Sequence, residues 1–303
     1  MASSTPAFAT VEIPRRPAAV AAEFWRSPAV RRFRRNRTAI IGLVAIVLMV
    51  MAALAAPLLA GADPLDVQLQ RNLIPPGSGG YLLGTDELGR DLWSRIVHGS
   101  RISLSLGVIS VGIGLFTGIP IPALAAYRGG WADSLVMRLV DVLLSFPAIL
   151  LAIVVVSILG PSIYNAMIAV GVAQGPIYAR LVRGVILSLK EREFVEAARA
   201  IGSSDVRVVF RHILPNCLSP IIIQSTLLIA QSILSASALS FLGLGAEPPL
   251  PEWGALLSKG RLYLRTAPYL VTFPGLAIVI TVLSFNLFGD GLREALDPRM
   301  RER

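Results

Sequence analysis

Six long apolar runs set the hydrophobic pattern of the chain, and polar segments separate them. An α-helix needs roughly 20 apolar residues to cross the hydrocarbon core of a membrane, at about 1.5 Å per residue. The pattern predicts six membrane-spanning helices, at residues 39–60, 102–127, 142–159, 163–179, 218–244 and 269–288. The fourth run is the weakest, because Asn165, Gln174 and Pro176 interrupt it. The expected fold class is therefore all-α, a polytopic membrane protein.

Composition supports a membrane protein. Apolar residues make up 54% of the chain and charged residues only 16%, whereas soluble domains usually carry about 25% charge. The mean hydropathy is +0.67. These values disfavour a disordered chain and an ordinary soluble enzyme, and the single Cys217 excludes an internal disulfide or a paired-cysteine metal site.

The charge distribution predicts the orientation of the spans. With the N-terminus inside and alternating spans, the inner segments hold most of the 28 lysines and arginines. The outer segments hold equal numbers of acidic and basic residues, as the positive-inside rule requires. Both termini are then inside. A nucleic-acid binder would gather its basic residues on one folded face, so we expect no nucleic-acid partner.

We divide the chain into two parts. Residues 1–37 form a cytoplasmic N-terminal tail, and residues 38–303 form the transmembrane domain. Between residues 24 and 37, aromatic and apolar side chains alternate with arginines. This segment suits a short helix lying on an anionic inner leaflet, although the arginines could also serve only to fix the topology.

Residues for catalysis or metal binding are not grouped in the sequence. The two histidines, His98 and His212, fall on opposite sides of the membrane in this topology. Neither Lys190 nor Lys259 follows a glycine, so the chain lacks the phosphate-binding GxxxxGK[ST] loop. We therefore predict no catalytic residue, no metal site and no cofactor on this chain, which is not an enzyme by itself.

The polar residues inside the apolar runs are neutral. Secondary transporters and proton pumps place ionisable residues at mid-membrane, but here Arg138 and Asp141 lie only at the inner end of the third run, where their spacing predicts an ion pair. The neutral residues are Asn165, Gln174, Gln224, Ser225, Thr226, Gln231 and Asn286. They either join helices or line a polar path. The candidates for a translocation path are Gln174, Gln224, Gln231 and Asn286.

The inner loop of residues 188–216 is too long for a simple turn. We expect a helix over residues 188–200, a stop at Gly202 and a second helix from Val206 to Pro215. Its apolar stripe is Val206, Val209, Phe210 and Ile213. Such a helix could lie on the lipid, insert into a groove on a partner protein, or pack against its own spans.

The outer loop of residues 61–100 also carries a helix signal. Thr85 is placed to cap a helix that runs to about residue 97. Asp86 with Arg90, and Asp91 with Arg95, have the acid-before-base i,i+4 spacing of helical ion pairs.

The inner loop resembles the EAA loop of the permeases of bacterial ABC importers. Glu196-Ala197-Ala198 is followed by Gly202 and by Leu214-Pro215 at the spacing of that motif, with His212 at the usual isoleucine position. In that family the loop is a coupling helix that docks into a cleft on the ATPase subunit. The residues that the resemblance assigns to coupling are Glu196, Ala197, Ala198, Gly202, Val206, Val209, Phe210, Leu214 and Pro215.

Further segments are similar to the C-type permeases of dipeptide and oligopeptide importers. They lie at residues 32–37, 83–91, 101–104, 240–245, 252–254, 273–275 and 289–293, and the resemblance runs from about residue 22 to 301. It implies the type I ABC importer permease fold with six spans. It also places Asp86, Glu87 and Arg90 under a docked binding protein, whereas the same residues could form a lid packed on the chain's own outer surface.

The resemblance implies a multi-pass subunit in a bacterial cytoplasmic membrane that moves peptides by alternating access. Its partners would be a homologous B-type permease, two ATPase subunits that hold ATP and Mg, and an extracytoplasmic solute-binding protein. Relatives in this family carry nickel complexes, haem or oligosaccharides instead. An autonomous channel or secondary transporter, and a membrane-anchored signalling scaffold, are the alternatives from other classes.

Overall fold

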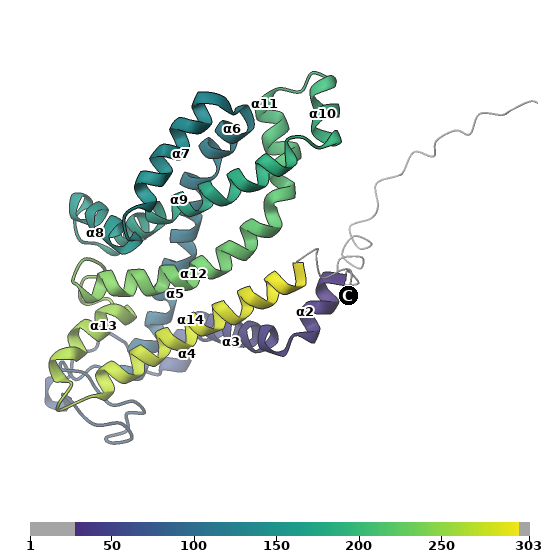
Figure 1. Ribbon diagram of the computed structural model, residues 1–303. Helices are drawn as coiled ribbons and strands as arrows, with labels where there is room; N and C mark the ends of the chain where they lie inside the picture. The colour runs from purple at the N-terminus through teal and green to yellow at the C-terminus, as the bar shows by residue number, and fades with distance from the viewer. Residues whose placement is uncertain (1–27, 297–303) are drawn as a thin grey trace, which may run out of the picture.

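The computed structural model describes residues 28–296, so most of the N-terminal tail and the last seven residues, 297–303, lie outside it. Phe24 and Trp25 of the expected interfacial segment fall in the part that is not described. The described chain is a bundle of helices (Figure 1). They are α2 (Pro28–Arg35), α3 (Arg37–Leu54), α4 (Ala56–Ala60), η1 (Leu69–Arg71), α5 (Leu92–Gly118), α6 (Pro120–Arg128), α7 (Gly130–Leu144), α8 (Ala148–Leu159), α9 (Ile163–Leu189), α10 (Glu193–Ala200), α11 (Asp205–Arg207), η2 (Val208–Ile213), η3 (Leu214–Cys217), α12 (Leu218–Phe241), α13 (Trp253–Gly260), η4 (Arg261–Tyr263) and α14 (Tyr269–Leu296).

Four helical segments in the described chain are long and apolar enough to cross a membrane. They are α3, the joined α5 and α6 over Leu92–Arg128, the continuous segment Asp205–Phe241, and α14. The third expected span is not one straight helix, because α7 and α8 meet at an angle of 94°. Pro147 lies at this break. It has no N–H to donate and keeps the preceding residue out of the helical region, so it separates the two helices.

Helix α9 replaces the fourth expected span, but it is not among the segments apolar enough to cross by composition. It has 27 residues and continues ten residues past the expected end. Buried residues occur along its whole length, including Gln174 and Pro176. By contrast, the most apolar span, α3, has a mean hydropathy of 2.4 with only 17% of that window buried. Because α9 is enclosed by other helices, it does not need an apolar surface against lipid.

Two pairs of glycines bring α5 and α9 into close contact. Gly114 and Gly118 on α5 face Gly171 and Gly175 on α9, so both helices carry a GxxxG motif at their contact. A Cβ atom on Gly171 would lie 2.7 Å from the carbonyl oxygen of Ser110, and one on Gly114 would lie 3.2 Å from the carbonyl oxygen of Gly171. Larger residues would hold the two backbones apart. Small residues at such spacing are typical of tightly packed membrane helices.

Polar side chains join α9 to α12 beside the glycine contact. Gln174 Nε2 donates to Ser232 Oγ at 2.7 Å and to the carbonyl oxygen of Leu228 at 3.3 Å. Tyr178 and Ser225 share a hydrogen bond of 2.8 Å between their hydroxyls. Buried polar groups in a membrane protein need such partners. We call α5, α9 and α12 the central unit, because these contacts pack the three helices together.

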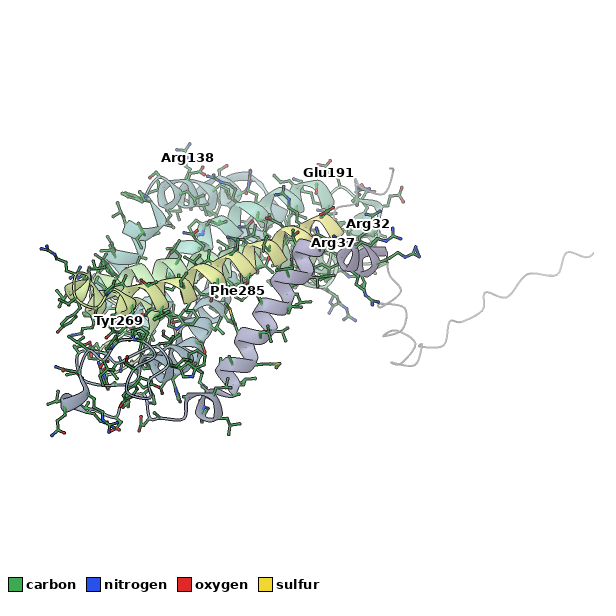
Figure 2. All side chains as sticks on the ribbon, turned by 90° about the horizontal axis from the view of Figure 1, so that it is seen from below. Arg32, Arg37, Arg138, Glu191, Tyr269 and Phe285 are labelled. Carbon is green, nitrogen blue, oxygen red and sulfur yellow. The ribbon has the colours of Figure 1, made fainter. Side chains whose placement is uncertain are left out.

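Different elements lie at the two ends of the bundle. In Figure 1, α10 and α11 lie at the upper right, whereas α13 lies at the lower left, near the segment that leads into α5. Figure 2 shows Arg32, Arg37 and Glu191 at one end and Tyr269 at the other. Phe33 of α2 packs edge-on against Phe288 of α14, with ring centres 5.7 Å apart. Part of the expected interfacial segment therefore packs against the bundle.

We predict that Gly171→Leu weakens the central unit, because the new side chain meets the α5 backbone. Overpacking of this kind costs roughly 1–3 kcal/mol. The thermal unfolding temperature of the purified protein in detergent should fall by several degrees. Gly184→Leu is the matched control, because Gly184 lies on the same helix and nothing stands within 4 Å of its Cβ position. Equal unfolding temperatures for the two variants would show that the glycine contact is not tight.

Candidate functional site

The inner loop forms a helical hairpin around Gly202. Helix α10 ends at Ala200, and Gly202 follows with φ of +79°, in the left-handed region that glycine adopts most easily. The expected helix stop is therefore confirmed. Nothing lies within 4 Å of a Cβ atom at this position, so the backbone of the turn is open to a partner.

Two details of the expected loop were wrong. The first helix begins at Glu193 rather than at residue 188, because Ser188 and Leu189 belong to the end of α9. Pro215 does not end the second helix, since helical turns continue from Asp205 into α12. A π-helical stretch over Val208–Ile213 shifts the hydrogen-bond register, and Pro215 then stands in the first turn of η3, where its missing N–H leaves no gap.

The apolar stripe of the second helix is divided between two environments. Val209 and Ile213 are fully buried against the chain's own helices. Val206 and Phe210 remain 51% and 42% exposed, and Ile201 in the turn is 81% exposed. We call Ile201, Val206 and Phe210 the loop knob. The connector interpretation holds for the buried half of the stripe, and the exposed half is free to contact lipid or a partner.

The remaining expected coupling residues follow the same division. Ala198 is buried and Leu214 is half-buried, whereas Glu196, Ala197 and Pro215 are exposed. The hairpin thus presents one face to its own bundle and another to the outside.

In the outer loop, Asp86 is the acceptor around which the chain turns. Its carboxylate accepts hydrogen bonds from Arg90 Nε at 2.7 Å and from the backbone N–H groups of Leu88 and Arg90 at 2.9 and 3.0 Å. Arg95 Nε lies 3.4 Å from the same carboxylate. Asp86, Arg90 and Arg95 are all buried. The expected pair of Asp86 with Arg90 is confirmed, although the two residues do not lie on a helix.

Two expectations for the outer loop were wrong. Thr85 does not cap a helix, because its hydroxyl donates to the carbonyl oxygen of Arg71. Asp91 is the cap instead, accepting from the N–H groups of Trp93 and Ser94 at 3.3 and 3.1 Å. It therefore does not pair with Arg95. Burial raises the pKa of Asp91, and these two hydrogen bonds oppose the rise.

The burial of Asp86 and Arg90 favours the lid interpretation for these two residues. Each satisfies the other within the chain. Of the three expected docking residues, Glu87 is the least enclosed, and its contact with a binding protein stays a prediction.

Glu252 was not predicted from the sequence as a site residue, and it is fully buried between α5, α12 and α13. It caps α13 by accepting from the N–H groups of Gly254 and Ala255, both at 2.9 Å. Ser103 of α5 and Ser237 of α12 also donate to it, at 3.4 and 3.3 Å. Burial raises the pKa of Glu252, and its hydrogen bonds counteract the rise. The available signal was an acidic residue directly before a short helical segment.

The four candidate path residues divide into two groups. Gln174 is buried and joins α9 to α12, so it acts as a contact between helices. Gln224, Gln231 and Asn286 make no side-chain hydrogen bond within residues 28–296, and Gln231 is exposed. Gln224 and Gln231 are seven residues apart and share one face of α12. A path role for these three stays a prediction.

In the second half of α7, the expected ion pair of Arg138 with Asp141 was wrong. Asp141 accepts from Arg180 of α9 at 2.7 Å, and Arg138 points away from the bundle (Figure 2). Arg183 of α9 makes a two-pronged ion pair with Asp133 of α7, with both distances 2.8 Å. Both long-range pairs join α7 to α9.

The fold is similar to that of a chain in a solved ABC transporter. A chain of the MetNI methionine ABC transporter in an inward-facing conformation matches with a TM-score of 0.54, at 21% identity over 67% of this chain and 97% of that chain. A chain in a second crystal form of that transporter matches with a TM-score of 0.53. Two protein families match the sequence. Residues 118–302 match the family described as binding-protein-dependent transport system inner membrane component. Residues 23–76 match the family described as N-terminal TM domain of oligopeptide transport permease C.

Curated relatives narrow the branch. The dipeptide transport system permease protein DppC of Alkalihalophilus pseudofirmus is 47% identical over 91% of this chain and 90% of its own length. A di/tripeptide transport system permease of Pseudomonas aeruginosa is 45% identical over 92% of both chains. A glutathione transport system permease of Escherichia coli is 48% identical over 92% of this chain and 90% of its own length.

The chain belongs to the family of binding-protein-dependent transport system inner membrane components. It is a membrane-embedded permease of an ABC importer, and within that family it is of the C type found in dipeptide and oligopeptide systems. The resemblance inferred from the EAA loop is thereby confirmed.

We predict that Asp86→Asn destabilises the outer loop, because it leaves two buried guanidinium groups without their shared carboxylate. Removing one partner of a buried ion pair costs roughly 3–5 kcal/mol. The unfolding temperature in detergent should fall clearly. Glu87→Gln is the control and should have little effect, because Glu87 is the more exposed acid and lies 3.5 Å from Arg90. An Asp86→Asn variant as stable as the parent protein would contradict the role given to this carboxylate.

Proposed function

We propose that this permease translocates short peptides across a bacterial cytoplasmic membrane as one of two permeases in an ATP-driven importer. The observation that carries the proposal is the near-full-length similarity to permeases named for dipeptides, di/tripeptides and glutathione. These solutes share peptide bonds, charged ends and a small size. Neutral polar side chains such as Gln224, Gln231 and Asn286 suit a path for solutes of this kind, because they offer hydrogen bonds without a fixed charge.

The proposed partners are a homologous B-type permease, two ATPase subunits and an extracytoplasmic solute-binding protein. ATP and Mg would be held by the ATPase subunits, and this chain would have no ATPase site. Six spans with both termini inside complete the proposed topology. The pair α7–α8 is apolar enough for one span but is bent by 94°, and α9 is the span that composition alone does not support. This orientation puts α10 and α11 on the cytoplasmic side.

The loop knob is the proposed contact with an ATPase subunit. Ile201, Val206 and Phe210 are exposed on one hairpin, between the spans that the sequence predicts at residues 163–179 and 218–244. A water-facing apolar patch there is costly unless a partner covers it. The open turn at Gly202 allows a close backbone approach. Movement of the ATPase subunits would displace this hairpin and open the spans to one side of the membrane at a time.

Competition for uptake tests the substrate assignment. Cells lacking this chain should not accumulate a labelled dipeptide, and the restored chain should return uptake. Excess unlabelled di- and tripeptides should compete, whereas nickel complexes, haem and oligosaccharides should not. Competition by one of these other solutes and not by peptides would overturn the peptide assignment. Uptake by the purified chain alone, in vesicles without ATP, would instead show an autonomous carrier.

We predict that Phe210→Ala weakens the attachment of the ATPase subunits. A buried aromatic anchor in an interface contributes about 2 kcal/mol or more, which corresponds to a roughly 30-fold weaker complex. Co-purification of the ATPase should fall while the amount of permease in the membrane stays the same. Leu262→Ala, at an exposed apolar residue near the opposite end, should leave co-purification unchanged. Full retention of the ATPase by the Phe210 variant would remove the loop knob from the interface.

A further inference from the structure

The last two residues of α6 contact both arms of the inner hairpin. Tyr127 Oη accepts a hydrogen bond from Arg199 Nε at 2.7 Å, and the Arg199 guanidinium lies over the Tyr127 ring, 4.8 Å from its centre. The next residue, Arg128, donates from its Nε to Asp205 at 2.9 Å. Arg199 lies in the last turn of α10, and Asp205 is the first residue of α11.

These two attachment points lie on either side of the open turn. Gly202 stands between Arg199 and Asp205, and Ile201 projects from the turn with 81% of its surface exposed. The apex of the hairpin is therefore exposed. Both arms are attached to the bundle through buried residues such as Ala198 and Val209, and consecutive residues at the end of α6 add a polar contact to each arm. Tyr127 itself is buried in the core around α6 and α9, so it provides a fixed support.

The ion pair of Arg128 with Asp205 adds little to the stability of the fold. Arg128 and Asp205 have side chains that are 60% and 46% exposed, and ion pairs this exposed contribute little to the stability of a fold. The position of this pair, at the base of the second arm of the hairpin, matters more for the argument than its contribution to stability. A hairpin joined to its bundle at one arm only could bend at the glycine turn when pushed. One joined at both arms passes its displacement to the helix that holds it.

That helix is α6, which continues α5 of the central unit through a single joining residue, Ile119. Two glycines with positive φ, Gly129 and Gly130, follow directly after Arg128. The chain can change direction there, so the end of α6 can follow the hairpin without carrying α7 rigidly with it.

We propose that Tyr127 and Arg128 are positioning residues that clamp both arms of the inner hairpin to α6, so that displacement of the hairpin drives α5 and α6. This inference rests on the proposed function of the hairpin as the contact with the ATPase. In this proposal the two residues act on the hairpin and not on solute or nucleotide. It determines how much of each ATP-driven movement reaches the spans.

The test uses the complete importer in vesicles, with both permeases, the ATPase subunits and the binding protein. Peptide uptake and ATP hydrolysis are measured in the same sample, and their ratio is the readout. Arg128→Asp should lower uptake per ATP several-fold, while ATPase co-purification and the unfolding temperature stay near those of the parent. Tyr127→Phe, which keeps the ring and removes the hydroxyl acceptor, should lower the ratio less. The exchange Arg128→Asp with Asp205→Arg restores an ion pair of opposite polarity and should recover at least half of the lost ratio.

The matched control is Arg180→Asp. The Arg180–Asp141 pair is also exposed, with both side chains 60% exposed and 2.7 Å between the charged atoms, but it joins α7 to α9 and does not touch the hairpin. It should leave uptake per ATP unchanged. An unchanged ratio in Arg128→Asp, or a double exchange no better than the single change, would overturn the clamp.

The clamp and the coupling role of the hairpin fail in different ways. If Phe210→Ala lowers ATPase co-purification but Arg128→Asp leaves the ratio unchanged, the hairpin contacts the ATPase and the clamp is wrong. If Phe210→Ala has no effect on co-purification, the proposed contact itself is wrong. If Arg128→Asp lowers the unfolding temperature clearly as well as uptake per ATP, Arg128 has a structural role, and this result would also overturn the clamp.

Discussion

The close contact of the α5 and α9 backbones is the constraint on which the rest of the structure depends. Helices in a membrane gain little from the hydrophobic effect when they associate, because lipid is as apolar as their side chains. Gly114 and Gly118 allow α9 to approach until its glycines meet the α5 backbone. The same principle operates between α3 and α14, where a Cβ atom on Gly42 would lie 2.7 Å from the carbonyl oxygen of Ser284.

This contact makes a polar helix possible inside the bundle. With α5 close on one side, α9 is enclosed, and Gln174 finds its partner on α12. The central unit then carries a specialised structure at each end. At one end, Glu252 attaches α13 to α5 and α12, and Asp86 lies within ion-pair distance of two buried arginines. At the other end, Tyr127 and Arg128 hold the hairpin that we propose as the ATPase contact.

Much of this arrangement could be predicted from the sequence, because local pattern determines it. The apolar runs located the helices, and the spacing around Gly202 located the turn. The hairpin also matched a family motif. The GxxxG spacings on α5 and α9 are also present in the sequence and could have predicted the close contact of these helices, although no prediction was drawn from them.

The features that could not be predicted depend on three-dimensional neighbours. Asp141 pairs with Arg180 of α9 and not with Arg138, which is only three residues away in the sequence, because α9 lies against α7 in space. Asp91 could have paired with Arg95, but it caps α5 while Arg95 lies beside Asp86. The six-span count rested on hydropathy, which reports how well a segment of the sequence suits an apolar environment such as lipid. Hydropathy therefore undervalues α9, whose neighbours are other helices.

The central claim is that the hairpin, α6 and the central unit move together. A spin-label distance between Ser204 of the hairpin and Phe116 of α5, both exposed, tests it most directly in the assembled importer. The account predicts the same distance distribution without nucleotide and with ATP bound. In the same samples, a pair of labels on the hairpins of the two permeases should change, which shows that ATP has engaged. A change in the distance between Ser204 and Phe116 on ATP binding would contradict the account, because the hairpin would then move independently of α5 and α6.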